Sequence, residues 1–251
     1  MLRSRSRLLW VSGVVILIAI LVVSYYSGLY TMFFMGQPSI QPIMEDSSDA
    51  VVRLPPPRTV GSMSVEEAIA KRRSIREYTD EPLSLEELSQ ILWAAQGITE
   101  PKWGLRSAPS AGATYPLEVY AVIGDGGVEG LEAGVYHYSP RDHELRRVLR
   151  GDHRGPLSKA ALGQVWVAAA PVDLVIAAIY ERTTMRYGER GIRYVHMEVG
   201  HVGQNVYLEA AALGLGTVVV GAFDDEEVRR ILNLPEGEKP LYIIPIGRPK
   251  H

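Results

Sequence analysis

Apolar residues recur every three or four positions in two long stretches of the chain, residues 85–96 and 191–213. This period matches one face of an α-helix, so both stretches are predicted to form amphipathic helices with a buried face. Gly97 and Gly214 follow them, and glycine often ends a helix because it adopts left-handed backbone angles without strain. Shorter helices are predicted at 64–73, 157–168 and 224–232.

Short apolar runs bounded by turn residues predict the strands. The run at 172–179 is almost continuously apolar, which indicates a strand that is buried on both faces. Further strands are predicted at 117–123, 134–138, 143–149, 217–220 and 241–246. Helices and strands are mixed along the chain without strict alternation, and this order is typical of the α+β class.

The N-terminal part of the chain has a different pattern. Three arginines among the first seven residues precede residues 8–44, which carry no charge, and residues 8–30 are long and apolar enough to span a bilayer. The arginines predict an N-terminus in the cytoplasm and a C-terminal domain outside it. A cleavable signal peptide is the rival interpretation, although residues 24–28 match a cleavage site poorly. The sequence therefore predicts a single-pass membrane protein.

These patterns divide the chain into three parts. Residues 1–35 are predicted to be a membrane anchor with a short, basic cytoplasmic tail. Residues 36–58 are predicted to be a linker, because they are rich in proline and end in a stiff run of three prolines. Residues 59–251 are long enough to fold around a core of their own.

Composition excludes several kinds of chemistry. The chain of 251 residues has no cysteine, which excludes disulfides, thiolate metal sites and a cysteine nucleophile. Its net charge of −3 gives no global attraction to nucleic acid. His196 and His201 are five residues apart, which is not the spacing of four that lets two helical histidines share a metal. We therefore predict no metal site and no nucleic-acid partner.

A basic cluster follows the first predicted helix of the folded part. Arg72, Arg73, Ser74 and Arg76 combine planar, charged donors with a small hydroxyl, and this set suits the oxygens of a phosphate monoester. The alternative from these residues alone is that the cations interact with the end of the helix and are otherwise solvated.

Six segments in order resemble the flavin-dependent nitroreductase family, and within it the branch of peptide azoline dehydrogenases (SagB- and ThcOx-like proteins). They cover nearly the whole of residues 64–250. The segments are RRSIREY at 72–78, APSAGATYPLEVY at 108–120, YGERGIRY at 187–194, GHVGQN at 200–205, LGLGT with VGAFD at 213–224, and IPIGRP at 244–249.

The resemblance implies a mostly antiparallel sheet wrapped by helices, and a homodimer that binds FMN where two chains meet. It assigns Arg72, Arg73, Ser74 and Arg76 to the FMN phosphate and the polar edge of the ring, together with Arg248 and Lys250. It also implies that a loop of the partner chain packs on the flavin ring, and that a second segment lies beside the reactive N5 edge of the flavin. The loop residues are Pro109, Ser110, Ala111, Gly112 and Ala113, and the second segment is Gly221 and Ala222.

The resemblance also implies an acid-base pair at Arg186 and Tyr187. The dehydrogenase branch has a Lys-Tyr pair there, whereas an arginine stays protonated and is a poor base. The predicted function is therefore an FMN-dependent oxidoreductase. It is either an NAD(P)H-driven reductase of nitro or quinone compounds or a SagB-type dehydrogenase. The alternative is a membrane-tethered binding or scaffold module without turnover.

Overall fold

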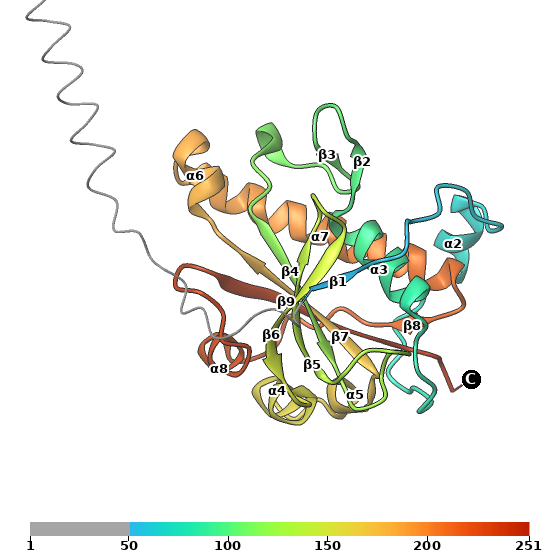
Figure 1. The fold of residues 1–251 in the computed structure, drawn as a ribbon. Coiled ribbons are helices and arrows are strands. Elements are labelled where there is room, and N and C mark those ends of the chain that lie inside the picture. The colour runs from blue at the N-terminus through green and yellow to red at the C-terminus, as the bar shows by residue number, and fades with distance from the viewer. Residues whose placement is uncertain (1–50, 251) are drawn as a thin grey trace, which may run out of the picture. The chain divides into compact units, whose positions relative to one another are not determined.

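The computed structural model describes residues 51–250 (Figure 1). The predicted anchor and most of the predicted linker lie outside these residues. Seven strands form one sheet in the order β1-β6-β5-β4-β7-β9-β8, and every neighbouring pair in it is antiparallel. The strands are β1 (Val51–Arg53), β4 (Leu117–Ile123), β5 (Gly134–Ser139), β6 (Glu144–Arg150), β7 (Val172–Ala178), β8 (Gly216–Thr217) and β9 (Lys239–Gly247). A small hairpin of β2 (Ile98–Glu100) and β3 (Leu105–Arg106) stands apart.

Helices cover both faces of the sheet (Figure 1). They are α2 (Val65–Lys71), α3 (Leu85–Gln96), α4 (Arg154–Ala160), α5 (Val165–Ala169), α6 (Glu181–Tyr187), α7 (Arg190–Ala212) and α8 (Asp225–Ile231), with a 3₁₀ turn η1 (Ala111–Ala113). The buried faces of α3 and α7 pack on one side of the sheet, and α4, α5 and α8 pack on the other. Along β7, Leu174 and Ile176 point into the first core and Val175 into the second. The predicted α+β class, with a large antiparallel sheet, is confirmed.

Capping boxes fix the start of α2 and α3, the first two helices of the described chain. Ser64 accepts a hydrogen bond from the backbone N–H of Glu67, and the Glu67 carboxylate accepts one from the backbone N–H of Ser64. Ser84 and Glu87 repeat this arrangement at α3. These reciprocal bonds satisfy backbone donors that a helix N-terminus otherwise leaves open.

Two predicted elements differ in the structure. The helix predicted at 157–168 is two short helices, because Leu162 and Gly163 adopt left-handed angles with φ of 57° and 76° and interrupt it. The strand predicted at 217–220 is shorter and continues only as a single bridge between Val220 and Ile243.

The sheet also reaches into the stretch that was predicted to be a linker. Val51–Arg53 forms β1 at the sheet edge beside β6, and Leu54 is buried after it. This strand forms because its backbone pairs with β6. It was not predicted, because three residues before a run of prolines carry almost no periodic signal.

The structure contradicts the predicted membrane location. Among residues 51–250 there is no helix whose length and hydrophobicity would let it cross a bilayer. Residues 8–30, from which that prediction came, lie outside the described part of the chain. The prediction of a membrane location, with its tether and orientation, is therefore corrected and plays no part in the functional account.

Candidate functional site

The basic segment that follows α2 runs along the edge of the sheet. Ser74 forms a parallel bridge with Thr217 of β8, and the Ile75 N–H donates to the Thr217 carbonyl at 2.9 Å. Gly216 lies so close that a Cβ there would meet the Ile75 side chain at 2.7 Å. The segment is thus held by its backbone, which leaves its side chains available.

Three guanidinium groups of this segment carry no ion pair within residues 51–250. Arg72 lies over the Tyr207 ring at 5.0 Å, and Arg76 lies over the Trp166 ring at 5.4 Å. Arg73 Nη1 donates to the carbonyl of Ala70 at 3.0 Å and to the carbonyl of Arg72 at 2.7 Å. The segment therefore presents positive charge that carboxylates of the described chain do not compensate.

Tyr207 of α7 holds this region together, although the sequence did not indicate it as a site residue. Its hydroxyl accepts a hydrogen bond from the Val219 N–H at 3.0 Å and lies 2.9 Å from Ser74 Oγ. A polar aromatic residue within the apolar helix 191–213 was the available signal. A hollow of about 310 Å³ lies beside it, lined by Lys71, Arg72, Arg73, Ile75, Tyr207, Ala211, Gly214, Leu215, Thr217 and Pro249.

Gly221 and Ala222 form an exposed, small-residue segment after the Val220 bridge. Gln164 Nε2 donates to the Ala222 carbonyl at 2.8 Å and ties the segment to the turn between α4 and α5. We refer to Arg72, Arg73, Ser74, Arg76, Tyr207 and residues 217–222 as the cationic group.

Arg248 is engaged differently from the other predicted cations. Its Nη2 donates to both carboxylate oxygens of Glu87 at 3.0 Å, and its Nε lies 3.3 Å from Glu81. Lys250 is exposed, and its backbone N–H donates to the Glu77 carbonyl at 3.1 Å. To bind a phosphate as predicted, Arg248 would have to release the carboxylates of Glu87 and Glu81.

The second set of predicted residues meets at α6. Gly112 has a φ of 61°, and its carbonyl accepts a hydrogen bond from Arg186 Nη1 at 3.1 Å. A Cβ on Gly112 would stand 2.5 Å from the Tyr187 hydroxyl, so a residue without a side chain is needed here. We refer to residues 109–113, Arg186 and Tyr187 as the loop group.

The two groups lie at opposite ends of α7 (Figure 1). The loop group adjoins its N-terminal end through α6 and η1, and the cationic group adjoins its C-terminal end through α2 and β8. A helix of 23 residues is roughly 34 Å long, at a rise of about 1.5 Å per residue. Within the described chain, no hydrogen bond or ion pair joins the two groups.

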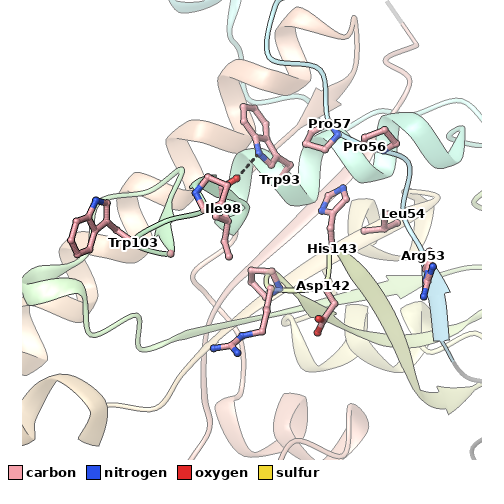
Figure 2. Close-up of a pocket in the computed structure, with 13 residues that line it drawn as sticks. Arg53, Leu54, Pro56, Pro57, Trp93, Ile98, Trp103, Asp142 and His143 are labelled. Carbon is pink, nitrogen blue, oxygen red and sulfur yellow. Dashed lines mark hydrogen bonds between the residues drawn. The ribbon is translucent and has the colours of Figure 1, made fainter.

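A separate groove of about 820 Å³ lies between β1, the β2-β3 hairpin and the β5-β6 turn (Figure 2). Trp93, Trp103 and His143 are among its lining residues, with Arg53 and four prolines. His143 lies 3.0 Å from the Pro55 carbonyl and 2.8 Å from Ser89 Oγ through Nε2, and burial lowers its pKa. The groove contains none of the predicted site residues.

The model of the "Nitroreductase family" matches residues 69–248, which is most of the folded part. The chain belongs to the nitroreductase family. Members of this family are generally oxidoreductases that bind a flavin, and they are commonly dimeric.

Relatives in the nitroreductase family support this assignment. The chain is 54% identical to "Putative nitroreductase MJ1384" of Methanocaldococcus jannaschii over 189 residues. This alignment covers 75% of this chain and 93% of that protein. It is 31% identical over 157 residues to the microcin B17-processing protein McbC of Escherichia coli, covering 61% and 58%. It is 28% identical over 198 residues to an FMN reductase of Bacillus subtilis, covering 72% and 64%. The crystal structure of "a putative nitroreductase" from Ralstonia eutropha superposes with a TM-score of 0.71 at 33% identity, covering 81% of this chain and 91% of that chain.

The residues of the cationic group fit the flavin that nitroreductases bind. A hollow lined by Lys71, Arg72 and Arg73 suits a phosphate, because a dianion needs several cations and short donors. Gly221 and Ala222 suit the approach of a flat ring, since neither carries bulk beyond a methyl group.

Proposed function

We propose that this protein is an FMN-dependent oxidoreductase that works as a homodimer. The observation that carries the proposal is the hollow beside α7, whose Arg72 and Arg73 have no ion pair within residues 51–250, in a chain of the nitroreductase family. Bound FMN would supply an N5 atom that accepts a hydride from a donor and passes it to a second substrate. The protein holds, orients and shields the reacting groups.

The cationic group would hold the phosphate end of the cofactor. Arg72 and Arg73 provide charged donors, and Ser74 provides a neutral one that Tyr207 holds in place at 2.9 Å. The Gly221 and Ala222 backbone would then lie beside the ring, kept there by the hydrogen bond from Gln164.

Separation of the two groups along α7 supports a dimer. A two-fold axis across the middle of α7 would place the loop group of one chain near the cationic group of its partner. The middle of α7 suits such a contact, because Met197, Gly200 and His201 are exposed and a Cβ on Gly200 would meet no atom within 4 Å. In the dimer, residues 109–113 would cover a ring bound mainly by the other chain.

Arg186 favours a reductase over a dehydrogenase. Arginine is a poor base, and the Arg186 guanidinium donates to the Gly112 carbonyl, so Arg186 can stabilise negative charge but does not suit proton removal from a substrate. Tyr187 can donate a proton to a reduced nitro or quinone oxygen. The reaction we propose is therefore NAD(P)H-driven reduction of nitro or quinone compounds. Similarity to McbC keeps a SagB-type dehydrogenation as the second candidate.

A visible absorption spectrum of the purified protein tests the proposal. We expect flavin bands at about one FMN per chain, and bleaching when NADH or NADPH is added without oxygen. Bands that stay oxidised with both donors would contradict the reductase and favour the dehydrogenase. A colourless protein that FMN neither colours nor stabilises against heat would refute the function.

A further inference from the structure

Glu198 is a buried carboxyl that the proposed reaction leaves without a task. It lies on the inner face of α7 and is 2% exposed, and its Oε1 atom has no hydrogen-bond partner within residues 51–250. A buried carboxylate without a partner is costly, so burial raises the pKa of Glu198 to about 7. Its proton equilibrium therefore falls in the neutral range.

Three polar side chains from other elements face Glu198: Gln96 from α3, Arg106 from β3, and Ser110. Arg106 is the charged one among them. Its Nη1 donates to Gln96 Oε1 at 2.9 Å, and its guanidinium lies 4.5 Å from the Tyr115 ring. Gln96 Nε2 is also buried without a hydrogen-bond partner in the described chain. Glu198 is thus close to a cation but not neutralised by an ion pair.

Ser110 connects this buried carboxyl to the loop group. Ser110 Oγ accepts the Tyr115 N–H at 2.9 Å, which leaves its hydroxyl hydrogen to be donated elsewhere. Its proximity lowers the pKa of Glu198, as expected for a hydroxyl that donates to a carboxylate. Because Ser110 immediately precedes the η1 turn, Glu198 lies close to the loop group.

We propose that Glu198 is a redox-linked proton site, which binds a proton from water when the flavin beside the loop group is reduced. The inference rests on the proposed function. A hydride brings two electrons and one proton, and so adds one negative charge to the site. The proton that Glu198 binds restores the charge, and Glu198 releases it to water when the hydride leaves for the second substrate. Glu198 acts through Ser110 and through its charge, so it is a positioning residue.

The midpoint potential of the FMN-loaded full-length protein tests this coupling between about pH 5.5 and 9. In the wild type, the slope of potential against pH changes near the Glu198 pKa. In Glu198→Gln that change of slope is lost, because the amide does not titrate. Glu209→Gln is the matched control. Glu209 is a carboxyl of the same helix whose pKa burial also raises, but its polar neighbours are Gln90 and Arg58. This control keeps the wild-type change of slope.

A second measurement needs no flavin. A carboxyl whose pKa is raised by folding favours the folded state at low pH, and this contribution is lost as pH rises toward its folded value of about 7. Thermal unfolding of the flavin-free wild type should therefore show a loss of stability over that range that Glu198→Gln does not show.

The outcomes separate the two proposals. A flavoprotein whose change of slope is absent, or persists in Glu198→Gln, would overturn this inference and leave the proposed function in place. A protein that binds no flavin would overturn both proposals.

Discussion

The two ends of α7 carry two different kinds of polar structure. At its C-terminal end, the cationic group exposes guanidinium groups that are held by stacking on aromatic rings. In its N-terminal half, the small residues of the loop group lie near two buried polar side chains, Glu198 and Gln96. The first presents fixed charge to solvent, and the second shields a titratable group from it.

This difference suggests a division of labour. Arginines with fixed positive charge suit a phosphate, whose charge persists through every turnover. A buried carboxyl with a raised pKa suits the end of the site where charge changes during the reaction. The following predictions test that division, from the largest expected effect to the smallest.

Removing the two adjacent arginines should have the largest effect. In Arg72→Ala/Arg73→Ala, FMN affinity should fall by at least about 100-fold, since each charge-assisted hydrogen bond contributes about 1.5–3 kcal/mol. Riboflavin, which lacks the phosphate, should bind almost as in the wild type. Fluorescence titration measures the affinities for FMN and for riboflavin. The matched control is Arg229→Ala/Arg230→Ala on α8, a pair that binds Glu226 and Glu227 instead. Equal losses for FMN and riboflavin would refute the phosphate assignment.

Gly112→Ala should be the most destabilising single change. It forces a side chain into left-handed backbone angles, at a cost of about 1–2 kcal/mol, and against the Tyr187 hydroxyl. Chemical unfolding measures the loss. Gly155→Ala is the control, because a Cβ there would meet no atom within 4 Å and alanine favours the α4 helix. If both variants are equally stable, the close contact at Gly112 is incorrect.

Tyr207→Phe should weaken FMN binding by about tenfold. The change leaves the Val219 N–H and the Ser74 hydroxyl without their shared partner, worth roughly 1–1.5 kcal/mol. Tyr136→Phe on β5 is the control and should leave FMN affinity unchanged. It removes a comparable hydroxyl, which donates to the Glu132 carbonyl at 2.8 Å. A Tyr207→Phe protein with wild-type affinity would show that Tyr207 does not position the cationic group.

Arg248→Ala should have the smallest effect on the cofactor. It removes the ion pair with Glu87, so the free energy of unfolding should fall by about 0.5–1 kcal/mol. FMN affinity should change less than in Arg72→Ala, because carboxylates already engage Arg248. Glu87→Gln breaks the same pair from the other side and should match the loss of stability. A loss of FMN affinity in Arg248→Ala as large as in Arg72→Ala would show that this residue exchanges its carboxylates for the phosphate.

Sequence patterns predicted the parts of the fold that local spacing determines. The α7 helix and β4 appear where periodicity placed them, and α2 and α3 begin within a residue of the predicted positions. Two elements were missed for different reasons. Strand β1 depends on pairing with β6, which is distant in sequence, and helix α6 has no apolar period.

The candidate site shows the same limit. The sequence indicated the charged residues of the cationic group, and it resembled a family in which they meet a phosphate. It could not indicate that Arg248 pairs with Glu87, because 161 positions separate them. Nor could it indicate that Glu198 is buried near Ser110, since that proximity depends on how α7 packs against η1.

Mixing two defective variants tests the central claim most directly, that each flavin site combines the cationic group of one chain with the loop group of its partner. One variant is Arg72→Ala/Arg73→Ala, and the other is Pro109→Trp, which fills the loop side at an exposed residue. Each alone should bind little FMN. After unfolding and refolding together, half of the dimers contain both variants, and each of these dimers has one intact site. Flavin content should therefore recover to about a quarter of the wild-type value. No recovery in the mixture, with both variants folded and dimeric, would contradict the shared site.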